Sequence, residues 1–272
     1  ICQNEQEAAD GVKEIMLDKK FGASGNHVVV EEFLTGPEVS VLSFCDGKTV
    51  KPMVSSMDHK RALDHDEGLN TGGMGTVAPN PYYMPAVAER CMQEIFLPTV
   101  AAMQAEGCPF KGCLYFGLML TPDGPKVIEY NCRFGDPETQ VVLPLLESDL
   151  LTVMEATTNG TLDKTDVKFS DGAAACVILA SGGYPLAYEK GKEITGLTAG
   201  QLDAADVTVY HAGTAIKDGS LVTNGGRVLG VTATANTLPE ALKKAYAATE
   251  SIHFDKLHKR SDIGARALAA MQ

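Results

Sequence analysis

The spacing of hydrophobic and polar residues predicts a helix and then β-strands in the first part of the chain. Ala8, Val12 and Ile15–Met16 fall on one face of a helix. After a glycine-rich turn, FGASGNH, the β-branched run Val28–Val30 predicts a strand that leads into an acidic segment. The next segment, GPEVSVLSFCDGKTVKPMV, alternates around Asp46-Gly47 and predicts a β-hairpin.

The middle of the chain combines a long polar segment with stronger periodic signals. Residues 55–81 are glycine-rich with little periodicity, and a loop of that length is usually functional or disordered. Helical spacing over residues 84–107 predicts one helix, or two that are interrupted at Pro98. The segment GCLYFGLMLTPDGPKVIEYN predicts a second hairpin, and residues 137–158 predict a helix that begins near Pro137.

The last part of the chain has a different texture. A polar, turn-rich stretch, TNGTLDKTDVKFSDG, places a domain boundary near residue 162. Beyond it, short strands alternate with turns and lead into the helix LPEALKKAYAATESI, a pattern typical of a small α+β unit. We therefore expect two domains, residues 1–162 and 163–272.

Composition narrows the classes of partner and of compartment. The 272 residues are 44% hydrophobic, which allows a sizeable core, and the net charge of −12 disfavours nucleic acid and anionic membranes. No apolar run reaches the roughly 18 residues that span a bilayer, and no signal-peptide pattern is present. The 7 scattered cysteines predict reduced thiols in the cytoplasm and disfavour structural zinc.

Polar groups of both signs gather at the end of the second hairpin. Glu129 and Asn131 lie two residues apart on a strand, so their side chains leave the same face. A carboxylate and an amide oxygen suit Mg²⁺ or Mn²⁺, particularly when nucleotide phosphates complete the shell. Arg133 continues the spacing and could reach an anionic oxygen. The alternative is a surface strand end with a salt bridge.

Two further segments carry candidate chemistry. In EEFLTGPEVSV, the acids Glu31, Glu32 and Glu38 could accept from adenine N6 or from ribose hydroxyls, although a hairpin with solvated acids would look the same. In SSMDHKRALDHDEGLNTGGMG, residues 58–61 precede the glycine-rich residues 70–75. Backbone N–H groups of consecutive glycines can close round an anion, but such loops are also common without a ligand.

Taken together and in this order, these segments resemble the phosphoribosylamine–glycine ligase family, the glycinamide ribonucleotide synthetases of the ATP-grasp superfamily. RFGDPETQ matches that family's signature octapeptide, and DHKRALDHDEGLNTGGMG is similar to its substrate loop. ASGGYP, HAGT, NGGRVLGVTA and RSDIGARAL are similar to successive blocks of its C-terminal domain. The resemblance covers essentially all of the chain.

The resemblance implies an α+β fold, with an ATP-grasp domain that is incomplete at its N-terminus and a small α+β C-terminal domain. It also implies a reaction of purine synthesis. ATP phosphorylates glycine to glycyl phosphate, and the amine of 5-phosphoribosylamine then displaces phosphate to give glycinamide ribonucleotide and ADP. No enzyme nucleophile is needed, so the cysteines need no catalytic role.

Site roles follow from the same resemblance. The metal ligands would be Glu129 and Asn131, and the catalytic pair near the transferring phosphoryl group would be Arg133 and Asp136. The residues that contact ATP would be Glu31, Glu32, Phe33, Leu34 and Glu38. The side that holds 5-phosphoribosylamine would be lined by Asp58, Lys60, Arg61, Asn70, Thr71, Gly72, Gly73 and Gly75.

The beginning of the chain departs from the family pattern. Ile1 is not Met, and a full-length member would carry a further domain and a phosphate-contacting segment before it. We therefore expect a truncated chain that is inactive alone, and a monomer or weak dimer. Two alternatives remain open: another ATP-grasp carboxylate–amine ligase with a different acceptor, and a nucleotide-binding remnant without turnover.

Overall fold

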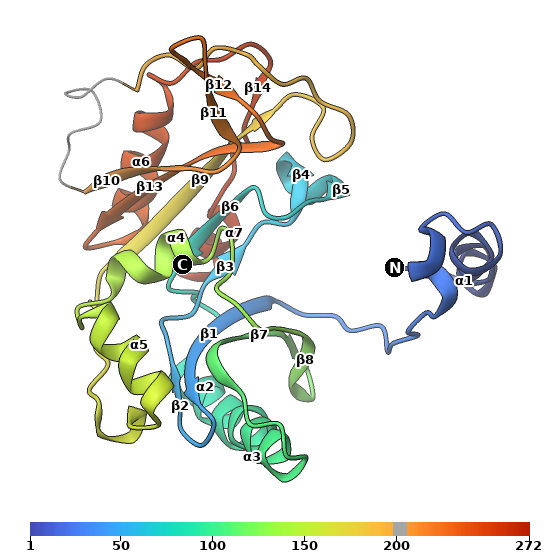
Figure 1. The fold of residues 1–272 in the computed structure, drawn as a ribbon, viewed down its shortest axis with the longest axis vertical. Coiled ribbons are helices and arrows are strands. Elements are labelled where there is room, and N and C mark those ends of the chain that lie inside the picture. The colour runs from blue at the N-terminus through green and yellow to red at the C-terminus, as the bar shows by residue number, and fades with distance from the viewer. Residues whose placement is uncertain (198–205) are drawn as a thin grey trace. The chain divides into compact units, whose positions relative to one another are not determined.

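The computed structural model describes residues 1–197 and 206–272, which divide into two units, 1–36 and 37–272. The first unit consists of the helix α1 (Glu5–Val12), the π-helical turn η1 (Lys13–Leu17) and the 3₁₀ turn η2 (Gly22–Asn26) (Figure 1). Asn4 caps α1, because its side-chain oxygen accepts from the backbone N–H of Glu7 at 2.9 Å. The predicted first helix is therefore confirmed.

The predicted strand at Val28–Val30 is wrong. These residues have no regular secondary structure, and the side chains of Val29 and Val30 are 84% and 86% exposed. Their β-branched character suits a strand, but a strand also needs a backbone partner and a face to bury. Among the described residues, no strand pairs with them.

The second unit begins with an antiparallel sheet of four strands in the order β2-β1-β7-β8. Its strands are β1 (Glu38–Asp46), β2 (Val50–Pro52), β7 (Lys111–Thr121) and β8 (Gly124–Asn131). Both predicted hairpins are confirmed, since β1 pairs with β2 and β7 pairs with β8. The central strand β1 is buried on both faces: Leu42 and Phe44 join one apolar cluster, and Val39 and Val41 join another.

Helices cover both faces of this sheet. The helix predicted over 84–107 is confirmed as α2 (Pro85–Cys91), the π-helical turn η4 (Met92–Phe96) and α3 (Leu97–Ala105) in succession. A π turn just before Pro98 accommodates the missing backbone donor.

The single helix predicted over 137–158 is wrong. The structure has α4 (Thr139–Val142), the 3₁₀ turn η5 (Leu143–Leu145) and, after a break, α5 (Leu150–Asn159). Pro144 lies in the turn, and Leu146 is extended, so the helix stops there. Asp149 then begins α5 by accepting from the backbone N–H of Thr152 at 2.7 Å.

A second sheet has the strand order β10-β13-β9-β6-β3, with β14 also paired to β9. Its strands are β10 (Val207–His211), β13 (Arg227–Ala235), β9 (Ala173–Ser181), β6 (Gly75–Ala78), β3 (Met57–Asp58) and β14 (Leu257–His258). The helix α6 (Leu238–Thr249) packs on this sheet through alanine and leucine side chains, and α7 (Ala265–Ala270) joins the same cluster (Figure 1).

The polar segment 55–81 is not one long loop. It contains β3, β6 and the hairpin β4 (Arg61–Leu63) and β5 (Glu67–Asn70), which encloses the turn η3 (Asp64–Asp66). Strands of two to four residues are too short to show periodicity in the sequence. Because β3 and β6 pair into the sheet of residues 173–258, ladder hydrogen bonds join segments from before and after residue 162. The domain division there stays a prediction.

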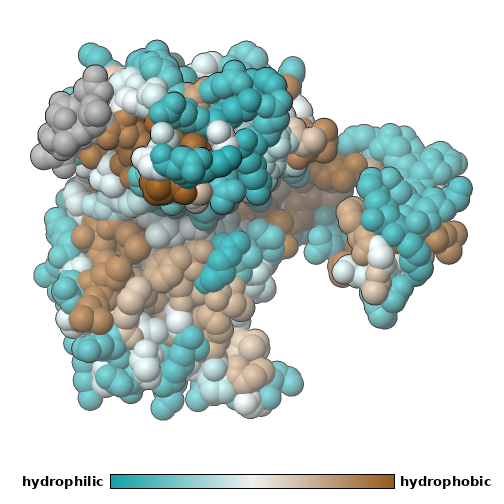
Figure 2. Space-filling model, turned by 45° about the horizontal axis from the view of Figure 1, so that its top comes forward, coloured by the Kyte–Doolittle hydropathy of each residue, from teal (hydrophilic) through white to brown (hydrophobic). Residues whose placement is uncertain are grey.

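The remaining elements of the described chain are the hairpin β11 (Thr214–Lys217) and β12 (Ser220–Thr223), and the turn η6 (Leu162–Lys164). Hydrophilic residues cover most of the surface formed by the C-terminal residues, at the top of the space-filling view (Figure 2). None of the described helices combines the length and apolar character needed to cross a membrane. Burial raises the pKa of Cys91 to about 11 and that of Cys176 to about 12, which keeps these thiols unreactive.

Candidate functional site

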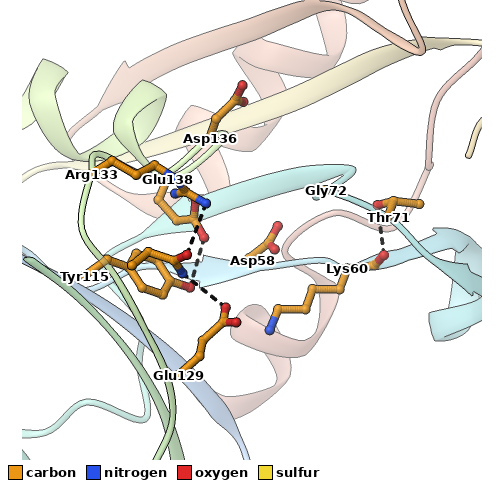
Figure 3. A pocket seen from close by; sticks show the side chains of 10 residues that line it. Asp58, Lys60, Thr71, Gly72, Tyr115, Glu129, Arg133, Asp136 and Glu138 are labelled. Carbon is orange, nitrogen blue, oxygen red and sulfur yellow. Dashed lines mark hydrogen bonds between the residues drawn. The ribbon is translucent and has the colours of Figure 1, made fainter. Parts of the chain in front are cut away.

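A cavity of about 150 Å³ lies where the ends of several strands of the second unit meet (Figure 3). The residues that line it are Asp58, Lys60, Thr71, Gly72, Tyr115, Glu129, Asn131, Arg133, Asp136 and Glu138. They come from four parts of the chain: β3 and its continuation, the glycine-rich loop, the hairpin β7–β8 and the octapeptide. Most of them carry a carboxylic acid or a basic group, so the cavity suits a small, strongly charged ligand.

The predicted metal pair lies on one wall of this cavity. Asn131 Nδ2 donates to Glu129 Oε1 at 3.3 Å, and Arg133 Nη2 donates to Asn131 Oδ1 at 3.4 Å. Gly117 faces Glu129 across β7 and β8, and a Cβ at Gly117 would lie 3.0 Å from Glu129 Cγ. The glycine therefore leaves room for the glutamate. The structure brings Glu129, Asn131 and Arg133 together, and their binding roles stay predictions.

Two carboxylates, Asp58 and Glu138, form the inner part of the cavity. Burial, with repulsion from Glu138, raises the pKa of Asp58 well above its usual range, and burial also raises the pKa of Glu138. The hydroxyl of Tyr115 donates to Glu138 Oε1 at 3.2 Å and lies 2.7 Å from Ser40 Oγ. Such a pair can hold a proton or bind a cationic group.

Lys60 supplies positive charge opposite these acids. Burial would lower the pKa of Lys60, but attraction to Glu38 and Asp58 outweighs it and raises that pKa. Lys60 Nζ lies 3.0 Å from Glu38 Oε2. Glu38, the predicted ribose-facing acid, thus does not line the cavity but pairs with Lys60, which does. Its contact with ribose stays a prediction.

The glycine-rich loop reaches the cavity through Thr71 and Gly72. The N–H of Gly72 donates to the Tyr184 hydroxyl, and the N–H of Gly73 donates to Thr71 Oγ1, each at 2.9 Å. Gly73 has φ of +112°, and a Cβ there would lie 2.5 Å from Pro137 Cδ. Glycine at position 73 is therefore required by close packing against the octapeptide. Anion binding by these N–H groups stays a prediction.

Four of the predicted substrate residues do not line the cavity. Arg61 and Asn70 face each other across β4 and β5, and Arg61 Nη1 donates to Gly68 O at 2.7 Å. Gly73 packs behind the loop. Gly75 pairs with Val177 in the sheet, and a Cβ at Gly75 would lie 2.7 Å from Cys176 O.

Arg227, at the start of β13, contacts both the glycine-rich loop and the octapeptide. Its role was not predicted from the sequence. Its Nη1 donates to Gly72 O at 2.9 Å, to Asp136 O at 2.8 Å and to Asp136 Oδ1 at 3.1 Å. Gln140 Nε2 also donates to Asp136 Oδ1, at 2.9 Å. Asp136, a predicted catalytic residue, is thus held in place at the cavity by two donors.

Tyr115 and Glu138 are further cavity residues to which sequence reasoning gave no role. Glu138 lies within the octapeptide, which was the only available signal, and Tyr115 lies in an apolar strand run that gave none. The predicted nucleotide residues Glu31, Glu32, Phe33 and Leu34 belong to the first unit. Their contacts with a nucleotide stay predictions.

Comparisons with known families agree with this geometry. Two family models match the chain: the ATP-grasp (A) domain of phosphoribosylglycinamide synthetase over residues 1–139, and its C domain over residues 174–266. The phosphoribosylamine–glycine ligase of Vibrio vulnificus is 48% identical over 98% of this chain and 62% of its own length. The trifunctional purine biosynthetic protein adenosine-3 of Gallus gallus is 50% identical over 99% of this chain and 27% of its own length.

Solved structures show the same relationship. The crystal structure of phosphoribosylamine–glycine ligase from Thermotoga maritima matches with a TM-score of 0.82 and 38% identity, over 95% of this chain and 63% of that one. The biotin carboxylase domain of Hydrogenobacter thermophilus 2-oxoglutarate carboxylase, solved with MgADP, matches with a TM-score of 0.69 over all of this chain and 57% of that one. At 13% identity it shows the fold alone. The chain spans less than two thirds of each of these relatives.

Proposed function

Because the chain belongs to the phosphoribosylglycinamide synthetase family, with an ATP-grasp domain and a C domain, we propose that it carries the metal and acceptor side of a phosphoribosylamine–glycine ligase. The reaction joins glycine to 5-phosphoribosylamine and converts ATP to ADP and phosphate. A carboxylate reacts with an amine only after one of its oxygens becomes a good leaving group. Transfer of the γ-phosphoryl group to glycine provides that leaving group.

The observation that carries this proposal is the convergence of Glu129, Asn131, Arg133 and Lys60 on one cavity of about 150 Å³. Two hard oxygen donors face it without a thiol or an imidazole, which suits Mg²⁺ or Mn²⁺ rather than zinc. Such a metal, when bound with ATP, would neutralise phosphate charge during transfer.

Five further residues of the cavity have proposed roles that suit their surroundings. Arg133 is exposed at the cavity mouth, where its guanidinium can contact the transferring phosphoryl group. Asp136 is paired with Arg227 and would face the side of the reacting carboxylate. Asp58, Lys60 and Thr71 line the side that receives 5-phosphoribosylamine.

The proposal extends to the nucleotide and to the setting of the enzyme. Glu31, Glu32, Phe33 and Leu34 would contact the adenine end of ATP, and Glu38 would face its ribose. We place the enzyme in the cytoplasm as a monomer or weak dimer, acting on small molecules rather than on nucleic acid or membranes.

A binding experiment tests the acceptor side without requiring turnover. Calorimetric titration of glycinamide ribonucleotide, the stable product, into the 272-residue chain should give saturable binding. Lys60→Met should weaken it at least about tenfold, because a charge-assisted contact is lost. Lys217→Met, at an exposed position on β11, is the matched control and should leave the affinity unchanged. Absence of saturable binding, or equal binding by the Lys60 variant, would count against the proposal.

A further inference from the structure

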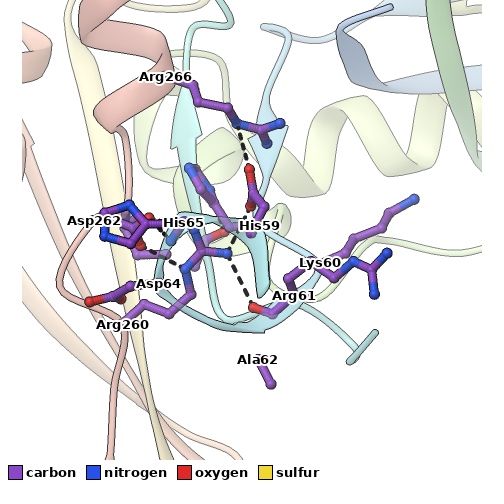
Figure 4. Close-up of polar contacts among 12 residues, drawn as sticks. His59, Lys60, Arg61, Ala62, Asp64, His65, Arg260, Asp262 and Arg266 are labelled. Carbon is purple, nitrogen blue, oxygen red and sulfur yellow. Dashed lines mark hydrogen bonds and ion pairs between the residues drawn. The ribbon is translucent and has the colours of Figure 1, made fainter. Parts of the chain in front are cut away.

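We infer that the C-terminal segment 258–266 positions the substrate-loop residues Asp58, Lys60 and Thr71. The positioning residues are Arg260 in that segment and His59 in the loop. The inference rests on the proposed function for the meaning of the cavity, but the contacts stand by themselves. The segment is far from the loop in sequence, and it makes hydrogen bonds and ion pairs to most of the residues from 59 to 66 (Figure 4).

His59 is the first of these connections. It lies between Asp58 and Lys60 in an extended segment, so its ring points away from the cavity that its two neighbours line. His59 is 1% exposed, and the backbone N–H of Gly264 donates to its Nε2 at 3.0 Å. Nδ1 must therefore carry the proton, which it donates to Gly75 O at 3.0 Å. One neutral imidazole thus connects β3, β6 and the C-terminal segment.

Arg260 is the second connection, and it is also 1% exposed. Its Nε and Nη2 donate to the two oxygens of Asp262 at 2.7 and 2.8 Å. Its Nη1 donates to Asp66 Oδ1 at 3.0 Å and to the backbone oxygen of Arg61 at 3.1 Å. A buried guanidinium with all of these partners fixes one geometry of the β4–β5 hairpin, because any other would leave charges unpaired.

Backbone contacts extend this attachment along the hairpin. Ser261 N–H donates to Asp64 Oδ1 at 2.8 Å, His65 N–H donates to Asp262 Oδ2 at 2.8 Å, and His258 Nε2 lies 2.7 Å from Ala62 O. His65 and Asp66 have φ of 60° and 56°, a left-handed conformation that non-glycine residues rarely adopt. The surrounding contacts hold the turn in that conformation.

The two sides of the cavity, the proposed acceptor side and the proposed metal side, are therefore held by different parts of the fold. Asp58, Lys60 and Thr71 belong to the segment that Arg260 and His59 fix, whereas Glu129 and Asn131 stand on the separate sheet of β1 and β7. Disturbing the attachment should loosen the acceptor side and leave the metal side unchanged. A purely structural role for Arg260 would instead weaken both sides together.

The test compares Asp66→Asn and Arg260→Lys with Asp166→Asn, a control that breaks an exposed ion pair with Lys168 outside both measured segments. Asp66→Asn keeps the side-chain shape and removes one charge, so folding is expected to survive. Amide hydrogen exchange over residues 59–70, exchange over 85–105, and the dissociation constants for glycinamide ribonucleotide and for Mn²⁺ are measured on the 272-residue chain.

In both test variants, exchange over 59–70 should accelerate about tenfold and product binding should weaken about tenfold, while 85–105 and Mn²⁺ binding stay within about twofold. The control should change none of the four. Unchanged exchange over 59–70, or an equal change at both segments, would overturn the inference, as would equal loss of product and Mn²⁺ binding. If even the unaltered chain binds no product, the proposed function fails, and the two exchange measurements alone decide the positioning role.

Discussion

At the scale of single residues, the proposed function depends most on the predicted metal pair, Glu129 and Asn131. Glu129→Gln keeps the shape of the side chain and removes its charge, so Mn²⁺ affinity of the chain should fall at least about tenfold. In an active ligase the same change should cost about 10²-fold or more in turnover, as expected for loss of an electrostatic partner. Electron paramagnetic resonance titration with Mn²⁺ measures the affinity, with the exposed Glu67→Gln as control. Equal affinity in both variants would remove Glu129 from the metal site.

His59 gives a pH dependence that the sign of its shift fixes. Burial, with repulsion from Arg260 and Arg266, lowers the pKa of His59 to about 4. Between about pH 6.5 and 4 the unfolded chain therefore binds a proton that the folded chain does not, so the free energy of unfolding falls as the pH falls. The free energy of unfolding lost across this window is about 3 kcal/mol, since one pKa unit corresponds to about 1.4 kcal/mol, and the loss is absent above about pH 7.

Urea unfolding at pH 7, 5.5 and 4.5 of the parent chain and of His59→Gln measures this contribution. The variant should be less stable at pH 7, because it loses the buried acceptor for Gly264, yet its stability should decline less on acidification. His27→Gln, at an exposed histidine, should follow the parent. Parallel pH profiles for the parent and His59→Gln would contradict a lowered pKa of His59 in the folded chain.

At the scale of elements, the glycine-rich loop must lie directly against the octapeptide. Gly73→Ala would bring a Cβ within 2.5 Å of Pro137 Cδ and 2.6 Å of Asp58 Oδ1, so one of the two segments must move. We expect a loss of about 1–3 kcal/mol in the free energy of unfolding and weaker product binding.

Gly219→Ala is the matched control for that change. Gly219 also has a positive φ, but a Cβ there would meet nothing within 4 Å. It therefore reports the backbone cost alone. Chemical unfolding of both variants measures the difference, and equal losses would mean that loop and octapeptide are not held in close contact.

The sequence pattern predicted correctly the elements that neighbouring residues determine. Glu129 and Asn131 follow from a period of two, and both hairpins follow from alternation around recognisable turns. The helix over 137–158 failed because Pro144 outweighed the apolar spacing. The strand at Val28–Val30 failed because propensity says nothing about whether a pairing partner is present.

At the scale of the whole molecule, the two arginines that sequence analysis missed, Arg227 and Arg260, were missed for the same reason. Arg227 reaches Asp136 across 91 positions and Gly72 across 155, and Arg260 reaches Arg61 across 199. Hydrophobic periodicity predicts only local structure, so it gives no sign of contacts between residues this far apart. In the sequence the two arginines cannot be distinguished from ordinary surface charges. The structure shows that C-terminal residues from β13 to the start of α7 hold both the octapeptide and the substrate loop. The C-terminal part therefore contributes to the proposed acceptor side.

The most direct test of the central claim joins this chain to the portion of the Vibrio vulnificus ligase that lies outside the matched region, in the order of that enzyme. The assay follows ADP formation with ATP, Mg²⁺, glycine and fresh 5-phosphoribosylamine, and circular dichroism confirms folding. The joined protein should form ADP only when both glycine and the amine are present. The 272-residue chain alone should stay near background, and Glu129→Gln in the joined protein should lower turnover at least about 10²-fold. A folded joined protein that forms no ADP in response to glycine, or a Glu129→Gln variant of it that keeps full activity, would contradict the account.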